Sequence, residues 1–224
     1  MKKLRFIPRK GVLTAVAAFL TAALASSIVE AKEYAADANF YRDGNTIGGR
    51  YWVLGDAGDW YLNATDKTQS ASGAIKVSDT KDLNGNPAKV FEWKKGKDGY
   101  VALADYSTQA NLTKYKDAAA IAIDLKVFKA PKAGVEFSMK GDTGKNAAMY
   151  IQDTLKGMTK KKWYTVFIPL SCMIDRGANF DKSVHLLQLR TSDKAKIGLA
   201  NVRLERMHES MKDCNQLVAV KLEK

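Results

Sequence analysis

Proline, cysteine and histidine are all scarce in this chain of 224 residues, which contains 4 Pro, 2 Cys and 2 His. Neither histidine belongs to an H-E-x-x-H pattern, so the usual signature of a zinc hydrolase is missing. The chain also lacks a G-x-S-x-G elbow, a Walker loop and a C-x-x-C pair, which excludes the common enzymes that carry these motifs. Strong helical periodicity is missing as well, so a helical bundle is not expected.

The first 31 residues have the organisation of a secretory signal peptide. Five Lys and Arg side chains lie among the first ten residues, and the uncharged, mostly apolar run 12–25 follows them. Val29-Glu30-Ala31 fits the small-x-small rule for cleavage, and Ala23-Leu24-Ala25 is a second candidate. The apolar run is shorter than the roughly 20 residues that a membrane span needs, which favours cleavage over an anchor. The sequence therefore predicts a periplasmic or secreted protein with no membrane span after signal removal.

Basic side chains outnumber acidic ones, with 36 Lys and Arg against 24 Asp and Glu. Five basic residues and Glu30 belong to the predicted leader, so the mature chain would carry 31 minus 23 charges, a net charge of +8. Such a surface suits anionic envelope polymers or has no specific partner, and export argues against nucleic acid. We expect the Lys160-Lys161-Lys162 triplet to be a solvated turn.

The two cysteines, Cys172 and Cys214, would enter an oxidising compartment after export. A single disulfide is plausible there, and it would join the C-terminal tail to the loop that follows Pro169. The alternative is two unpaired thiols.

Short alternating segments separated by turn residues dominate the chain from residue 50 to 206. The clearest are 163–168 and 119–128; in the second, residues 121, 123, 125 and 127 share one apolar face. This pattern predicts an all-β fold, an antiparallel β-sandwich. We expect 32–49 to be an irregular lead-in and 172–181 to be a loop. Residues 147–155 fit either a strand or a short helix, and the tail 207–224 either adds an edge strand or lies loose.

Aromatic residues carry the main functional signal. Sugar rings present flat faces of C–H groups, on which aromatic side chains pack while polar neighbours bind the hydroxyls. Trp60 follows a Gly-Asp loop, which favours exposure, and Trp93 alternates on a strand, where either core or surface is possible. Trp163 shares a face with Phe167, so we expect it to be buried.

Polar residues also recur at every second position on several predicted strands. If these strands are neighbours, their polar side chains form one surface that either contacts a glycan or is simply solvated. The predicted sugar-contacting set is Trp60, Trp93, Asp124, Glu136, Gln188 and Arg190.

Acidic pairs could support two other kinds of site. Asp56 and Asp59 flank a tight loop and could ligate a structural calcium ion. The simpler interpretation is that they belong to a solvated turn. Asp124 and Glu136 could form the carboxylate pair of a small glycosidase if their strands are adjacent. Nothing local provides a base for Cys172 as a nucleophile.

The end of the predicted domain resembles a known family. W-Y-T-V-F-I-P-L-S-C-M at 163–173, G-A-N-F-D-K-S-V at 177–184 and L-A-N-V-R-L at 199–204 are similar to the C-terminal galactose-binding-like domain of bacterial ExoP-type exo-β-glucanases of glycoside hydrolase family 3. F-E-W-K and Y-V-A-L-A-D-Y upstream resemble the middle of that domain. The family's cysteine-rich turn is replaced by Asp142-Thr143-Gly144, and the catalytic barrel that normally precedes the domain is absent.

The resemblance implies a galactose-binding-domain-like jelly roll with a carbohydrate-binding role. We therefore expect a free-standing, non-catalytic module that binds β-glucan-like polysaccharide or oligosaccharide without a cofactor. An envelope protein-interaction sandwich that has lost the sugar site is a second possibility, and a small glycosidase is a third. The oligomeric state is left open.

Overall fold

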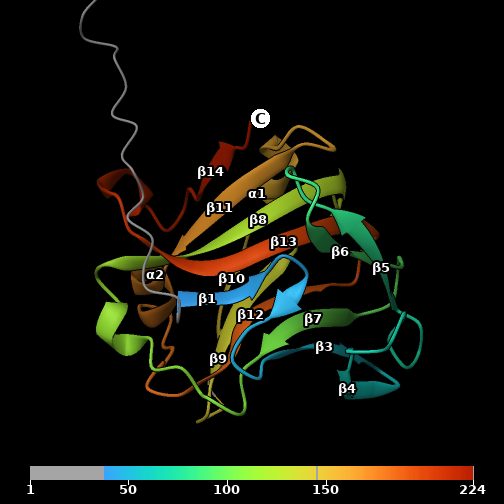
Figure 1. Cartoon of the computed structure of the whole chain (residues 1–224), viewed down its shortest axis with the longest axis horizontal. Coiled ribbons are helices and arrows are strands. Elements are labelled where there is room, and N and C mark those ends of the chain that lie inside the picture. The colour runs from blue at the N-terminus through green and yellow to red at the C-terminus, as the bar shows by residue number, and fades with distance from the viewer. Residues whose placement is uncertain (1–37, 145, 224) are drawn as a thin grey trace, which may run out of the picture. The chain divides into compact units, whose positions relative to one another are not determined.

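Two antiparallel β-sheets form the fold, as the alternating segments predict. The computed structural model describes residues 38–144 and 146–223, and the predicted signal peptide 1–31 lies outside them. Figure 1 shows the two sheets as separate layers. In the described residues one sheet has eight strands and the other has six.

The eight-stranded sheet has the order β14-β11-β8-β13-β1-β2. The first half of the long strand β13 pairs with β6, which in turn pairs with β5, whereas the second half of β13 pairs with β1. Its strands are β1 (Asn39–Arg42), β2 (Asn45–Thr46), β5 (Ile75–Lys81), β6 (Pro87–Trp93), β8 (Ala119–Lys129), β11 (Trp163–Pro169), β13 (Ala195–Arg206) and β14 (Val218–Lys221).

The six-stranded sheet has the order β10-β9-β12-β7-β3-β4. Its strands are β3 (Tyr51–Asp56), β4 (Asp59–Asn63), β7 (Gly99–Ala104), β9 (Glu136–Gly141), β10 (Asn146–Tyr150) and β12 (Ser183–Thr191). Helical turns are short: α1 (Gln152–Gly157), α2 (Leu170–Ile174) and the 3₁₀ turns η2 (Thr113–Tyr115) and η3 (Glu209–Met211). None of the helices in the described ranges is long and apolar enough to cross a membrane.

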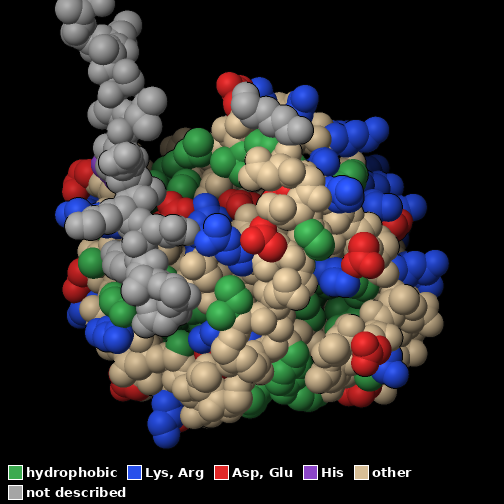
Figure 2. Space-filling view, in the orientation of Figure 1, with side chains coloured by type: hydrophobic (Ala, Val, Ile, Leu, Met, Phe, Trp, Pro, Cys, Tyr) green, Lys and Arg blue, Asp and Glu red, His purple; other side chains and the backbone are tan. Residues whose placement is uncertain are grey.

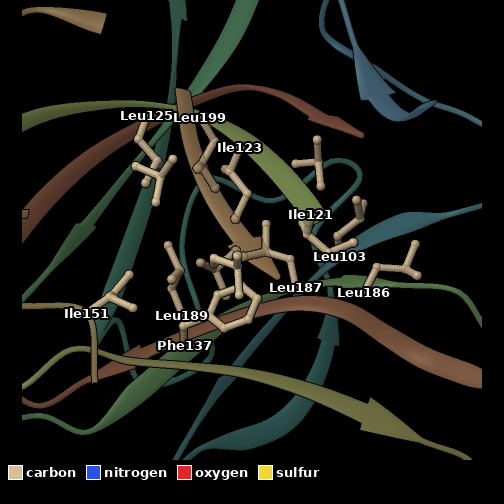
Figure 3. Close-up of a cluster of buried hydrophobic side chains, with 14 of the residues drawn as sticks. Leu103, Ile121, Ile123, Leu125, Phe137, Ile151, Leu186, Leu187, Leu189 and Leu199 are labelled. Atoms are coloured by element: carbon tan, nitrogen blue, oxygen red, sulfur yellow. The ribbon is translucent and has the colours of Figure 1, made fainter. Parts of the chain in front are cut away.

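The core lies between the two sheets. Ile121, Ile123 and Leu125 point inward from β8, as their shared apolar face predicts, and they meet Leu187 and Leu189 from β12. Figure 3 shows these side chains interdigitating in one cluster. Each fully buried Leu or Ile contributes about 1.5–3 kcal/mol through the apolar surface that it removes from water. The central core therefore holds the two sheets together and fixes which side chains face outward.

In two segments the secondary structure differs from the prediction, and in two others it resolves the predicted alternatives. The lead-in prediction is wrong for residues 39–46, because β1 and β2 form a hairpin around Asp43 and Gly44, whose φ angles are 50° and 82°. Residues 147–155 contain both alternatives, the end of β10 and part of α1. The expected loop at 172–181 begins inside α2, and the tail adds β14 to the sheet edge beside β11.

The disulfide between Cys172 and Cys214 is confirmed, with a Cα–Cα distance of 5.4 Å. It ties α2 to the tail that leads into β14. Trp163 is buried as expected, but it does not belong to the core between the sheets. It lies on the outer face of the eight-stranded sheet with Ala88 and Ala200, against the partly buried Leu83 and Leu222.

Candidate functional site

The outer face of the six-stranded sheet gathers the exposed aromatic side chains. Among the described residues five large hydrophobic side chains are exposed, and four of them lie on or beside strands of this sheet: Trp60 (48 %), Tyr61 (41 %), Tyr106 (39 %) and Tyr150 (70 %). The fifth, Val220, lies on β14 of the other sheet. We call the surface around these four residues the aromatic face.

The floor of the aromatic face is made of small side chains. Ala102 and Ala104 of β7 point outward between β3 and β12, and Ala148 lies opposite Ser138 where β10 pairs with β9. Strand alternation explains this placement, because the intervening residues Val101 and Leu103 point into the core. The flat floor leaves the surrounding rings as the prominent features of the surface.

Trp60 is held in place by Tyr100. The two rings stack with centroids 6.2 Å apart and planes 20° apart, and the Tyr100 hydroxyl donates to the Trp60 carbonyl oxygen. Tyr100 itself lies over Gly55, where an added Cβ would overlap the ring. Glycine at position 55 is therefore required for Tyr100 to lie flat on the sheet and support Trp60.

A chain of polar contacts orders the other aromatic side chains. The hydroxyls of Tyr51 and Tyr61 are 2.6 Å apart, and the rings of Tyr61 and Tyr106 meet edge to face with centroids 5.3 Å apart. The Tyr106 hydroxyl lies 3.3 Å from Nε2 of His185, and Nδ1 of His185 lies 3.1 Å from Oε1 of Gln188.

Burial lowers the pKa of His185 to about 4, with a smaller contribution from Lys140, although the hydrogen bond with Gln188 opposes the shift. His185 is therefore neutral at pH 7. Because the Gln188 carbonyl oxygen can only accept, Nδ1 of His185 carries the proton and Nε2 accepts from Tyr106. The amide NH₂ of Gln188 is left to donate toward a ligand.

Arg190 and Asp98 form an ion pair at the edge of the face. Nε of Arg190 donates to both carboxylate oxygens of Asp98 at 3.1 Å, and this arginine lowers the pKa of Asp98 below its usual value. The Arg190 guanidinium carbon also lies 5.6 Å from the centroid of the Trp60 ring. Glu136 pairs with Arg190 across β9 and β12. Side chains of both charges, Arg190 and Lys140 against Asp98 and Glu136, therefore lie on this face.

Four of the six residues predicted to contact sugar come together here: Trp60, Glu136, Gln188 and Arg190. The aromatic face also contains residues that the prediction did not select, of which Tyr61, Tyr106 and Tyr150 are the most exposed. The alternation of Asn146, Ala148 and Tyr150 is a signal that could have identified Tyr150. It was not used, because residues 147–155 fitted either a strand or a short helix.

Trp93 is a correction to the predicted set. Its side chain is only 1 % exposed and packs in the core beside Phe91, and its Nε1 donates to the carbonyl of Gly99 at 3.0 Å. Phe91 and Trp93 occupy the inward positions of β6, so alternation directs both toward the core. Trp93 cannot stack on a sugar while the sandwich is folded.

Asp124 is a second correction, because it belongs to the other sheet. It lies on β8, where its carboxylate accepts from Thr165, Asn201 and Arg203 at 2.7, 2.7 and 3.0 Å. Asp124 and Glu136 therefore lie on strands of different sheets and do not form the adjacent pair that a glycosidase would need.

Asp56 and Asp59, the possible calcium ligands, both accept hydrogen bonds from the backbone. Asp56 is fully buried, and its carboxylate accepts from the backbone N–H groups of Gly58, Ser72 and Ala74. Burial alone would raise the pKa of Asp56, but hydrogen bonds from Ser70, Ser72 and Gly58 outweigh it and lower the pKa. Asp59 accepts from the backbone of Tyr61. The several N–H donors aimed at the Asp56 carboxylate do not suit a cation there, and the described residues contain no cluster of three or more potential metal ligands.

Comparison with known proteins points to one family. A family model named Exop_C and described as galactose-binding domain-like matches residues 52–204, more than half of the chain. No curated protein sequence gives a match.

Solved structures show the same fold at low sequence identity. The extra C-terminal domain of the exo-1,3/1,4-β-glucanase ExoP from a Pseudoalteromonas species has a TM-score of 0.61 at 15 % identity, over 75 % of this chain and 91 % of that domain. In the structure of the ExoP enzyme the match covers 20 % of the enzyme. A family 30 carbohydrate-binding module from a cellulosomal cellulase of Clostridium thermocellum has a TM-score of 0.53 at 13 % identity, over 75 % of this chain and 95 % of the module.

Proposed function

Because the chain belongs to the galactose-binding-domain-like Exop_C family, we propose that it is a non-catalytic carbohydrate-binding protein that recognises β-glucan-like polysaccharide on its aromatic face. The observation that carries the proposal is the gathering of Trp60, Tyr61, Tyr106 and Tyr150 on the outer surface of one sheet. Aromatic side chains that stay exposed in a folded domain mark surfaces that another molecule covers.

The chemistry of the aromatic face fits a neutral sugar chain. The C–H faces of glucose rings in a β-linked chain pack on aromatic rings and expel water. Charged side chains of both signs, Arg190 and Lys140 against Asp98 and Glu136, lie on this face, so it carries no positive excess with which to select an anionic ligand. Hydrogen-bonding groups between the rings, among them the amide of Gln188 and the Arg190–Asp98 pair, can meet hydroxyl groups.

Binding without catalysis is the simplest use of this face. A glycosidase needs a carboxylic acid whose pKa is raised so that it can donate a proton. Asp98 has the opposite environment, since Arg190 lowers its pKa. Two structural matches, to an extra domain of a glucanase and to a carbohydrate-binding module, agree in fold with a binding role.

We also propose that the protein works outside the cytoplasm, in the periplasm or after secretion. The disulfide between Cys172 and Cys214 supports this location, because such bonds persist mainly in oxidising compartments. Mass measurement of the protein recovered from cell fractions, which would reveal loss of residues 1–31, tests the proposal.

The binding proposal is tested by affinity electrophoresis and titration calorimetry with soluble barley β-glucan and laminarin. Trp60→Ala should weaken binding by about tenfold, since stacking of one ring contributes on the order of 1–1.5 kcal/mol. Val220→Ala is the matched control, because Val220 is equally exposed but lies on the other sheet. Its affinity should equal that of the unmodified protein.

Two outcomes would refute the proposal. One is the absence of binding to every neutral glucan by protein whose thermal unfolding is cooperative. The other is an equal loss of affinity in the Trp60→Ala and Val220→Ala variants, which would place the contact elsewhere. Salt provides a further check, because stacking on a neutral glucan should change little between about 50 and 500 mM NaCl, whereas a charge-driven contact would weaken.

A further inference from the structure

The outer face of the eight-stranded sheet carries a concave surface that the proposed function does not use. Three adjoining hollows of about 520, 280 and 210 Å³ cross this face. The first two share Asp82, Leu83, Trp163, Leu222 and Glu223, and the second and third share Asp124 and Asn201. Together they form one continuous depression, which we call the basic groove.

Cations outnumber anions along the basic groove. Its lining contains six cationic and three anionic side chains: Lys126, Lys161, Lys162, Lys221, Arg42 and Arg203 against Asp82, Asp124 and Glu223. Arg42, Arg203 and Lys221 are already paired with carboxylates, so the positive excess is carried by Lys126, Lys161 and Lys162. In the view of Figure 2, which faces this sheet, Lys and Arg side chains gather toward the upper right. The aromatic face has no such excess.

Three of these lysines are not engaged in ion pairs with other described residues of the protein. Within the described residues, Lys126, Lys161 and Lys162 form no salt bridge, although other surface lysines such as Lys89 and Lys196 do. Lys126 instead lies over the Trp163 and Phe128 rings, at 5.2 and 5.3 Å from their centroids. The backbone N–H of Lys161 donates to Val127, which fixes the triplet against the end of β8. These ammonium groups are therefore held beside the hollow and available to an anion.

Carboxylates within the groove narrow the class of ligand. Asp82 and Glu223 line the two larger hollows and can only accept hydrogen bonds. Asp82 already accepts from Asn84 and Asn86, and Glu223 accepts from Lys221, so only part of the accepting capacity of each carboxylate is left for a ligand. A ligand that carries both anionic groups and hydroxyls satisfies the lysines and these carboxylates together. The phosphodiester backbone of DNA offers no donors, and Trp163 is only 4 % exposed, so it provides no platform on which bases could stack. A lipid surface is flat, whereas these cations line a depression.

We propose that the basic groove binds an acidic polysaccharide, a chain whose sugar units carry carboxylate or sulfate groups. This would make the protein two-sided, with a neutral glycan on one sheet and an acidic one on the other. The inference does not depend on the function proposed for the aromatic face.

The test uses the full mature chain and alginate, a polyuronate, measured by titration calorimetry at about 50 and 500 mM NaCl. Alginate should bind at low salt and weaken at least about tenfold at high salt, because screening shortens the reach of exposed charges. The variant Lys161→Gln/Lys162→Gln should bind alginate at least about fivefold more weakly. The variant Lys114→Gln/Lys116→Gln removes the same charge from η2 and its C-terminal end, outside the groove, and should leave the affinity unchanged.

Dextran sulfate, a DNA duplex of about 20 base pairs and phosphatidylglycerol vesicles complete the design. Dextran sulfate should follow alginate in its dependence on Lys161 and Lys162. Tighter binding of DNA or vesicles than of alginate, with the same lysine dependence, would overturn the proposal in favour of that partner. Equal weakening in both lysine variants, or no alginate binding at low salt, would also overturn it.

The two binding proposals fail separately. Trp60→Ala should leave alginate binding intact, and Lys161→Gln/Lys162→Gln should leave β-glucan binding intact. Thermal unfolding of each variant confirms that the loss of one ligand does not reflect loss of the fold.

Discussion

Each outer face of this sandwich contains an Arg–Asp ion pair, but the two pairs differ in exposure and in what they contact. On the six-stranded sheet, Arg190 and Asp98 form an ion pair in which both side chains stay more than two-fifths exposed. On the eight-stranded sheet, Arg203 and Asp124 form a pair that is 20 % and 8 % exposed, inside a network with Thr165 and Asn201. The first pair edges a cluster of exposed rings, and the second holds neighbouring strands together. Composition alone does not distinguish an ion pair that borders a binding surface from one that holds strands together.

The clearest way to break this comparison is to remove one aspartate from each face. Asp124→Ala leaves Arg203 largely buried with Glu205 as its remaining acidic partner, and should lower the free energy of unfolding by about 4 kcal/mol. Asp98→Ala removes an exposed pair and should cost less than about 1 kcal/mol. Urea unfolding of both variants measures the difference. Similar costs in the two variants would contradict the distinction between the faces.

The disulfide sharpens the comparison, because it fixes the tail that borders only one face. Cys172→Ser/Cys214→Ser opens a loop with a sequence separation of 42 and should lower the free energy of unfolding by about 3–4 kcal/mol. β14 and Leu222 follow Cys214, so alginate binding should weaken while β-glucan binding persists. Calorimetry with both ligands below the unfolding temperature tests this. Equal loss of both ligands would mean that the tail affects the whole sandwich.

A pH dependence should originate from the aromatic face. The folded-state pKa of His185 is about 4 and its unfolded value is about 6.5, so between these values the unfolded chain binds the proton that the folded protein excludes. Stability should therefore be complete above pH 6.5 and fall by about 3 kcal/mol as the pH is lowered toward 4.

Comparison of urea unfolding at about pH 7 and pH 4.5 isolates this contribution. His185→Gln should show a smaller fall in stability than the unmodified protein, because burial lowers the pKa of His185. His208→Gln replaces an exposed histidine and should show the same fall as the unmodified protein. If both variants behave alike, His185 is not the group that titrates.

The smallest effect is expected at the far end of the aromatic face. Tyr150 is 70 % exposed, so Tyr150→Ala should change the free energy of unfolding by less than about 0.5 kcal/mol. It should weaken β-glucan binding by about fivefold, whereas Tyr150→Phe, which keeps the ring, should bind normally. Calorimetry distinguishes the two variants. A loss in Tyr150→Phe equal to that in Tyr150→Ala would assign the contact to the hydroxyl rather than the ring.

Strand periodicity was sufficient to predict the architecture. Ile121, Ile123 and Leu125 share a face because side chains alternate along a strand, and a core between two sheets is where such a face is buried. The cysteine pairing was also predictable, because the chain contains only two. Periodicity was less useful for Trp93, since alternation places it with Phe91 but does not say which side faces water.

The candidate site was predicted only in part, because strand periodicity shows which residues share a face but not which strands are neighbours. Trp60, Gln188 and Arg190 were identified as one group, but Asp124 was added to them because strand order is not written in the pattern of a single strand. β8 and β12 both alternate, yet they belong to different sheets. Tyr150 was missed because β10 and α1 follow one another within a few residues, which blurs both periodicities.

The amino-acid sequence by itself determined the class of fold, the alternation of each long strand and the partners in the disulfide, because these depend on local stereochemistry and on a choice among very few residues. The tertiary structure decided which strands are neighbours, and therefore whose outward-facing side chains lie side by side. It thereby decided which aromatic rings share a surface and which carboxylates are held in ion pairs. That decision depends on strand order in two separate sheets, which long-range packing between β8, β12 and β13 sets and no single segment encodes.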